Sequence, residues 1–235
     1  MTHGSIDELE AALREADYLP DRGLATALYL ALALEKPVLL EGDAGVGKTE
    51  AAKALATALD ARLIRRPLLE AIDTDDPVVL LIDEIDRADE EFEAFLLEVL
   101  SDFQITIPEL GTIRARRRPA VVLTSNRTRE LHDALKRRCL YHWIDYPTRE
   151  REAEIVAARL PGVPEAIAGR VCDAVALLRD RDLYKLPGVG ETIAWAQALL
   201  ALGGEEASLE ASVGAALKVR EDIERVRADG VLEGV

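Results

Sequence analysis

Aromatic residues, cysteines and long apolar runs are scarce in this sequence, and each shortage excludes a class of protein. Aromatic residues make up 4% of the 235 residues, so aliphatic side chains must fill the core. The two cysteines, Cys139 and Cys172, have neither metal-site spacing nor a disulfide framework, which favours a reducing compartment. No apolar run approaches the roughly 20 residues of a membrane span. The polar, acidic start, MTHGSIDELE, is unlike a signal peptide. We therefore expect a cytoplasmic protein without membrane contact.

Positive charge is also in short supply. The sequence has 29 Lys and Arg residues against 44 Asp and Glu residues, a formal net charge of −15. Such a surface repels nucleic acid as a whole, so any contact with a polyanion has to be local. The densest basic run, RARRR at 114–118, is interpreted as pairing with acidic neighbours rather than binding nucleic acid. His132, His142 and Trp143 are interpreted as packing or capping residues.

Apolar runs and helical periodicity alternate in the first part of the chain, which predicts an α/β fold with a parallel sheet. Helices are expected to begin at Pro20, at Lys48 and after the capping residue Asp89. The segment FQITIPELGTI (103–113) is expected to form a hairpin or an extended excursion, with Pro108 and Gly111 at its turn. The predicted strands are the apolar runs at 37–42, 62–66, 78–82, 119–126 and 141–147.

Only helical periodicity follows Pro147. The expected helices cover 148–161, 164–181, 190–202 and 205–228. We therefore predict two domains, a nucleotide-binding α/β domain at 1–147 and a smaller all-helical domain at 148–235.

The strongest motif is GDAGVGKT at 42–49, which fits the phosphate-loop pattern G-x-x-x-x-G-K-S/T between a predicted strand and a predicted helix. Glycines let the backbone turn tightly and point its N–H groups at phosphate oxygens, and the positive end of the helix points to the same place. Lys48 is expected to reach the terminal phosphates, and the Thr49 hydroxyl to ligate Mg²⁺. The predicted nucleotide-binding residues are Gly42, Asp43, Ala44, Gly45, Val46, Gly47, Lys48, Thr49 and Glu50.

Two acids follow the buried strand VVLLI, at the edge of the sheet where ligands bind in open parallel sheets. Asp83 is expected to hold Mg²⁺, mostly through its waters. Glu84 is expected to orient and polarise an attacking water, which favours hydrolysis over transfer to another acceptor. The sequence therefore predicts an NTPase, although an acid pair can also simply cap a strand.

Other polar residues have two readings each. Asn126 ends the strand PAVVLTSN and either bonds the attacking water or terminal phosphate, or makes a turn. Lys136, Arg137 and Arg138 either form a solvated basic helix end or supply a transition-state arginine to a neighbouring subunit. Without further information the residues leave both pairs of readings open.

The order of these segments resembles the AAA+ ATPases. GDAGVGKT, LLIDEIDRAD, VVLTSN and LKRRC follow one another and precede a helical module. The stretches FEAFLLEVLSDFQITIPELGTI and ALKRRCLYHWIDYP are more narrowly similar to the MoxR group, in the branch of carbon monoxide dehydrogenase accessory (CoxD-like) ATPases. The resemblance covers about residues 15–203.

The resemblance implies a five-stranded parallel sheet with a helical lid, ATP and Mg²⁺ as cofactors, and a homo-oligomeric ring with six subunits expected. Asp83 and Glu84 match the Walker B acids and Asn126 the sensor 1 position. Arg138 matches the arginine finger, with Arg137 as the alternative. Members act as chaperone-like remodellers that help metalloenzymes mature, often with a partner that carries a von Willebrand factor A domain.

Two features depart from the family pattern. The stretch from Arg62 to Val78 is short, as if the second strand, its helix and the central-pore segment were partly missing. Thr192 stands where many relatives have the sensor 2 arginine, and no residue is assigned to that role. Three functions follow as hypotheses: an ATPase that remodels a client protein, a nucleotide-gated interaction module with little or no hydrolysis, and a DNA motor supported only by RARRR.

Overall fold

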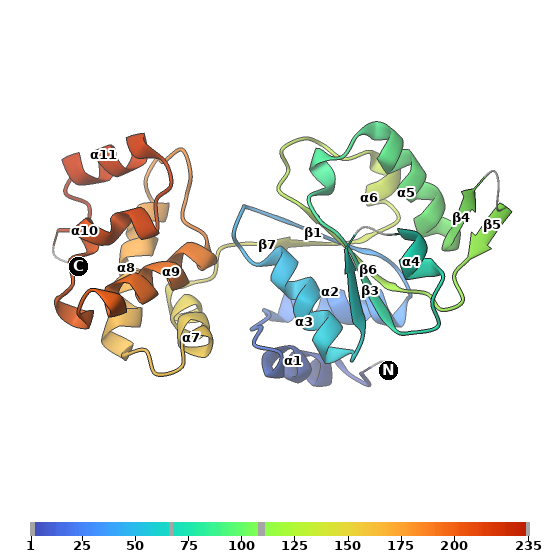
Figure 1. Cartoon of the computed structure of the whole chain (residues 1–235), viewed down its shortest axis with the longest axis horizontal. Coiled ribbons are helices and arrows are strands. Elements are labelled where there is room, and N and C mark those ends of the chain that lie inside the picture. The colour runs from blue at the N-terminus through green and yellow to red at the C-terminus, as the bar shows by residue number, and fades with distance from the viewer. Residues whose placement is uncertain (1–2, 66–67, 108–110, 234–235) are drawn as a thin grey trace. The chain divides into compact units, whose positions relative to one another are not determined.

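The computed structural model describes residues 3–65, 68–107 and 111–233 (Figure 1). The chain divides into two compact units. The first consists of Met1–Asp43 and Lys48–Ile144, and the second of Ala44–Gly47 and Asp145–Val235. No helix among the described residues combines the length and apolar character that crossing a bilayer requires.

The first unit is built on a five-stranded sheet in the order β2-β3-β6-β1-β7, and every neighbouring pair is parallel. This confirms the predicted five-stranded parallel sheet. All five residues of β3 are buried, as expected for a central strand covered on both faces. The strands are β1 (Val38–Gly42), β2 (Arg62–Arg65), β3 (Val78–Ile82), β6 (Ala120–Ser125) and β7 (Leu140–Ile144).

Helices cover both faces of this sheet. On one face α4, α5 and α6 pack on a core that includes Leu39, Leu80 and Leu123, and α2 and α3 lie on the other face with α1 packed on them (Figure 1). Opposite helix layers are what connections between parallel strands require. The helices are α1 (Ile6–Glu15), α2 (Arg22–Ala33), α3 (Lys48–Ala58), α4 (Leu68–Ile72), η1 (Ile85–Arg87), α5 (Glu90–Asp102) and α6 (Asp133–Lys136).

Side-chain caps explain where the helices begin. The Asp89 carboxylate accepts a hydrogen bond from the Phe92 N–H at 2.8 Å, which confirms the predicted cap of α5. The helix expected from Pro20 begins instead at Arg22, because Asp21 caps it through the Leu24 N–H at 2.7 Å.

Strands β4 (Gln104–Ile107) and β5 (Gly111–Arg114) pair in the antiparallel direction, as expected for a hairpin. Pro108, expected at its turn, lies outside the described residues. The short stretch before β3 still contains a strand and a five-residue helix, β2 and α4, so neither of these elements is missing. Arg66 and Pro67, between them, also lie outside the described residues.

The basic run at 114–118 pairs in part with acidic neighbours. Arg116 pairs with Asp73 and Asp75, each at 3.3 Å, and Arg118 pairs with Glu35 at 2.8 Å. Two of the four arginines of RARRR therefore form ion pairs with acidic side chains.

The second unit is helical and has its own core, which includes Val171, Trp195 and Val213. The single helix expected at 205–228 is wrong: this stretch is broken into short helices. The backbone is extended at Ala207 and at Val219, and Ser208 starts a new helix by accepting a hydrogen bond from the Ala211 N–H. The elements are α7 (Arg149–Arg159), α8 (Glu165–Arg179), α9 (Val189–Ala201), η2 (Gly204–Glu206), α10 (Leu209–Ser212), η3 (Val213–Ala215) and α11 (Arg220–Ala228).

A buried ion pair joins three helices of the second unit. The Arg179 guanidinium donates to both carboxylate oxygens of Glu152, at 2.6 and 2.8 Å, and to the Pro187 carbonyl at 2.9 Å. The Thr192 hydroxyl donates to the same carboxylate at 2.6 Å. Glu152 is 1% exposed, so its charge depends on these partners.

Arg179→Ala should lower the free energy of unfolding of the second unit by about 3–5 kcal/mol, because it leaves the Glu152 carboxylate buried without its counter-charge. Arg149→Ala is the control, since it removes the exposed pair with Asp173 and should leave the free energy of unfolding nearly unchanged. Denaturant unfolding in a Trp143→Phe background, where Trp195 alone reports, measures both variants. Equal losses would contradict the structural role of the buried pair.

Candidate functional site

The phosphate loop connects β1 to α3, as the motif predicts. Gly45 and Gly47 have φ of 85° and 98°, a region that other residues rarely adopt. The Lys48 ammonium group donates to the carbonyl oxygens of Gly42 and Asp43, both at 2.7 Å. Burial lowers the pKa of Lys48, and nearby acids, Asp43 first, act in the opposite direction. The lysine is therefore held at the loop by a carbonyl cage beside a group of carboxylates.

The first acid after β3 meets the end of the phosphate loop. The Thr49 hydroxyl donates to the two carboxylate oxygens of Asp83 at 3.0 and 3.3 Å, although the residues are 34 positions apart. Thr124, on the neighbouring strand β6, donates to the same carboxylate at 2.5 Å. Three elements, α3, β3 and β6, thus converge on Asp83.

The second acid occupies a strained position. Glu84 has φ of 52° and ψ of 50°, the left-handed region, which is unusual for a residue other than glycine. Its N–H donates to the Thr124 hydroxyl at 2.9 Å. Its carboxylate pairs with Arg87 at 3.0 Å and accepts a hydrogen bond from the Asn126 amide at 3.5 Å. The structure therefore brings Glu84 and Asn126 together.

Several polar residues around this site were not predicted from the sequence. Thr124 bonds both acids through one hydroxyl, as described above. Glu41, 4% exposed on β1, accepts a hydrogen bond from the Ser125 hydroxyl at 3.2 Å. Asp86, 2% exposed in η1, accepts from Thr128. The polar ends of β1 and β6, in LLEG and VVLTSN, are the signal that could have indicated them.

Asp86 keeps its charge although it is buried. Burial raises the pKa of its carboxyl group, but hydrogen bonds from the Thr128 hydroxyl and from backbone N–H groups of Thr128 and Asn126 outweigh this effect, so the pKa lies below its usual value.

The remaining predicted residues lie apart from this group. Arg138 donates to the Ser101 hydroxyl at 2.7 Å and to the Ala134 carbonyl at 3.1 Å. Arg137 is exposed, and its side chain makes no hydrogen bond or ion pair with the described residues. Glu50 forms an ion pair with Lys53 on the surface of α3. Ala44 and Val46 contribute backbone to the loop.

The donor set fits magnesium and a triphosphate. Mg²⁺ prefers oxygen ligands and is held in proteins by one or two groups together with substrate phosphates. A hydroxyl and a carboxylate 3.0 Å apart, from Thr49 and Asp83, supply such oxygens beside the lysine. Over residues 3–65, 68–107 and 111–233 no cluster of three or more His, Cys, Asp or Glu side chains forms a metal site of another kind.

Known structures share this arrangement of elements. A RuvB mutant from Thermotoga maritima superposes with a TM-score of 0.58 and 22% identity over all of this chain and 76% of RuvB. A second Thermotoga maritima RuvB structure, described as a Holliday junction branch migration motor, has a TM-score of 0.54 and 21% identity over 91% of this chain and 71% of RuvB. The chain has the fold of these RuvB structures. This agrees with the predicted fold.

Sequence comparison finds distant relatives. Proteasome-activating nucleotidase 2 from Halobacterium salinarum is 28% identical over 198 residues, which is 68% of this chain and 46% of the nucleotidase. Chaperone protein ClpB 2 from Parasynechococcus marenigrum is 35% identical over 119 residues, 37% of this chain and 13% of ClpB 2. The chain therefore spans less than half the length of either relative. No family model matches it.

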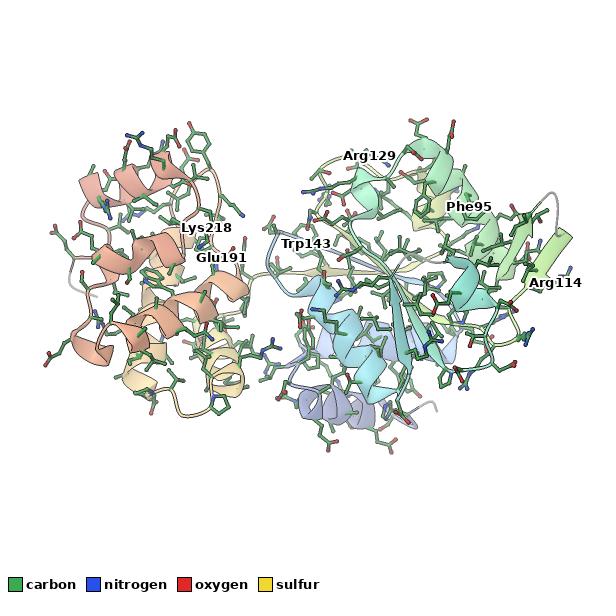
Figure 2. The ribbon with its side chains drawn as sticks, in the orientation of Figure 1. Phe95, Arg114, Arg129, Trp143, Glu191 and Lys218 are labelled. Carbon is green, nitrogen blue, oxygen red and sulfur yellow. The ribbon has the colours of Figure 1, made fainter. Side chains whose placement is uncertain are left out.

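Lys48→Ala should weaken binding of Mg·ATP by roughly 30- to 1,000-fold, the loss expected when a buried, hydrogen-bonded cation is removed from an anionic ligand. Lys218→Ala is the matched control, and Figure 2 labels Lys218. Its ammonium group likewise donates to two backbone carbonyls, those of Gly214 and Ala215, but in the second unit. Titration calorimetry measures both, and equal affinity of the Lys48 variant and the parent protein would refute the assignment.

Proposed function

We propose that this chain is a Mg²⁺-dependent ATPase that uses hydrolysis to remodel a client protein. The observation that carries the proposal is the group of side chains around Asp83 and Glu84. It combines a phosphate-loop hydroxyl, a metal-binding acid and a second acid bonded to Asn126. A protein that only binds nucleotide needs the first two, whereas the third is what water activation requires.

Each residue has a distinct task in this mechanism. Lys48 neutralises charge on the terminal phosphates, and Thr49 and Asp83 hold Mg²⁺, which when bound offsets the developing charge on the phosphate oxygens. Glu84 accepts a hydrogen bond from the attacking water and polarises it toward the phosphorus. Asn126 lies within hydrogen-bond reach of Glu84 and fixes the position of the same water. The products are ADP and inorganic phosphate.

The relatives support the remodelling role and limit its detail. A proteasome-activating nucleotidase, a ClpB chaperone and a branch migration motor share the fold or distant sequence similarity. We favour a protein client over DNA, because acidic neighbours already bind Arg116 and Arg118 in the basic run. The similarity to the MoxR group makes a metalloenzyme under maturation, with a partner carrying a von Willebrand factor A domain, the client system that we propose.

A nucleotide-gated module with little hydrolysis is the second candidate, and the ion pair between Arg87 and Glu84 favours it. In this ion pair, one carboxylate oxygen of Glu84 contacts Arg87 and is less available to the attacking water. The two side chains are 61% and 42% exposed, however, and such pairs contribute about 0–1 kcal/mol. A restraint of this size slows turnover by no more than about fivefold. It therefore modulates an ATPase but cannot abolish its activity.

Glu84→Gln should retain Mg·ATP affinity while phosphate release falls by about 10²–10⁴-fold, the usual contribution of a positioned acid or base. Glu35→Gln, which alters the surface partner of Arg118, should leave both quantities unchanged. Calorimetry gives the affinity, and a continuous phosphate assay gives the rate. If the parent protein releases no phosphate at any concentration, the nucleotide-gated module is the correct reading.

We further propose that an arginine from a neighbouring subunit completes the site in a hexameric ring. Arg138 matches the family position, but its guanidinium is already bonded to Ser101 and Ala134. Arg137, next to it, is exposed and makes no such bond among the described residues. Both arginines are therefore tested.

If an arginine acts in trans, its substitution by alanine should lower the rate of phosphate release by about 10³–10⁵-fold. Mixing that variant with the inactive Glu84→Gln variant should then restore activity. In mixed rings an intact Glu84 on one subunit meets an intact arginine from its neighbour. Activity of the parent should also rise as concentration drives assembly. Recovery on mixing for Arg137→Ala or Arg138→Ala identifies the residue, and no recovery for either variant contradicts a shared site.

A further inference from the structure

We propose that Asp86 is a positioning residue that holds the loop bearing Asn126 against the turn bearing Glu84, through its hydrogen bonds to Thr128. The proposal rests on the proposed ATPase function and adds a residue to its site. We use the name Asp86 clamp for the contact between Asp86 and Thr128.

The clamp joins two loops that are distant in sequence. Asp86 lies in η1, directly after the turn formed by Glu84, and is 2% exposed. Its Oδ2 atom accepts a hydrogen bond from the Thr128 N–H at 2.9 Å and another from the Thr128 hydroxyl at 2.7 Å. Both donors come from a residue 42 positions later in the chain, two residues after Asn126. One carboxylate therefore ties the end of β3 to the end of β6.

Backbone strain at both ends shows what the clamp has to hold. Glu84 has φ of 52° and Arg127 has φ of 55°, and neither residue is a glycine. A left-handed conformation costs about 1–2 kcal/mol for such residues, so it persists only where surrounding contacts fix it. Glu84 is itself one partner in the contact with Asn126, and Arg127 directly follows the other partner. Relaxation of the backbone at either residue would change the distance between the Glu84 carboxylate and the Asn126 amide.

Several side chains bond the backbone of these strained loops. The Thr124 hydroxyl accepts from the Glu84 N–H, and the Ser125 hydroxyl accepts from the Arg127 N–H at 3.0 Å. The first bond joins the Glu84 turn to β6 before Asn126, and the second is local to the Asn126 loop. The Asp86 clamp connects the residues after Asn126 to the Glu84 turn, and the bond from the Arg129 guanidinium to the Ala88 carbonyl continues this connection farther along both segments.

Glu93, the next buried acid along the chain, has a different task. Glu93 on α5 pairs with Arg129, labelled in Figure 2, and accepts a hydrogen bond from the His132 N–H at 2.9 Å. It anchors the segment that leads into α6, beyond Thr128. Asp86, by contrast, bonds a residue two positions after Asn126, so it acts closer to the amide than Glu93 does.

The test compares Asp86→Ala and Thr128→Val with the parent protein in ATP affinity and in kcat. Because a small displacement of a catalytic group costs up to about 100-fold in rate, we expect kcat to fall about 10- to 100-fold with the ATP affinity unchanged. Thr128→Val removes only the hydroxyl donor and keeps the N–H bond, so it should fold and show a smaller fall. Asp86→Asn keeps an acceptor oxygen for the Thr128 N–H and should recover part of kcat.

A double-mutant cycle separates positioning from general damage. If Asp86 acts through Asn126, adding Asp86→Ala to Asn126→Ala should cause no further fall in kcat. Asp222→Asn is the matched control. Asp222 is an equally buried aspartate, 1% exposed, that accepts hydrogen bonds from the N–H groups of Tyr184 and Lys185 in the second unit. It should lower the unfolding temperature without changing kcat at temperatures where the protein is folded.

The outcomes distinguish this inference from the proposed function. An active parent whose Asp86→Ala and Thr128→Val variants keep its kcat overturns the clamp alone. Additive losses with Asn126→Ala also overturn it, since Asp86 would then act independently of the amide. A parent that binds ATP without releasing phosphate overturns the proposed hydrolysis, and with it the catalytic purpose of the clamp.

Discussion

The hydrogen bonds that converge on the Asp83 carboxylate are the interaction on which the rest of the site depends. Thr49 donates to it from the start of α3, and Thr124 donates to it from the end of β6. Hydrogen bonds of this kind fix the orientation of a carboxylate and so present its oxygens to a metal ion in a defined position. The same Thr124 hydroxyl accepts from the Glu84 N–H and so fixes the backbone of the next acid. Loss of this one hydroxyl would loosen both acids.

The strand order makes this convergence possible. Because β6 lies between β3 and β1, its carboxyl end faces both the acids after β3 and the phosphate loop after β1. All three strands are parallel, so their polar ends meet at one edge of the sheet. Left-handed backbone at Glu84 and Arg127 then turns the chain sharply at this edge. The sheet supplies the proximity, and the side-chain bonds supply the orientation.

The sequence was sufficient for those features that depend on neighbouring residues. The phosphate loop and the strands follow from local patterns of glycine and apolar residues, and Asp89 caps α5 as its position predicts. Residues whose partners lie far along the chain were missed. Asp86 bonds Thr128 across 42 positions, and Glu41 bonds Ser125 across 84, distances at which no local pattern operates. The prediction for the stretch 205–228 failed for another reason, because its helical periodicity continues through extended backbone at Ala207 and Val219 and through the Ser208 cap.

Thr192 shows how one position can serve stability instead of catalysis. Its hydroxyl is fully buried and donates to Glu152, the acid that Arg179 also holds. An arginine at this position would place a second guanidinium and a larger side chain in a space that is already filled, at a cost typical of overpacking, about 1–3 kcal/mol or more. The second unit therefore cannot accept an arginine at this position without rearranging its own buried ion pair. The packing of the helical unit around Glu152 accounts for the absence of the arginine that the resemblance to AAA+ ATPases led us to expect there.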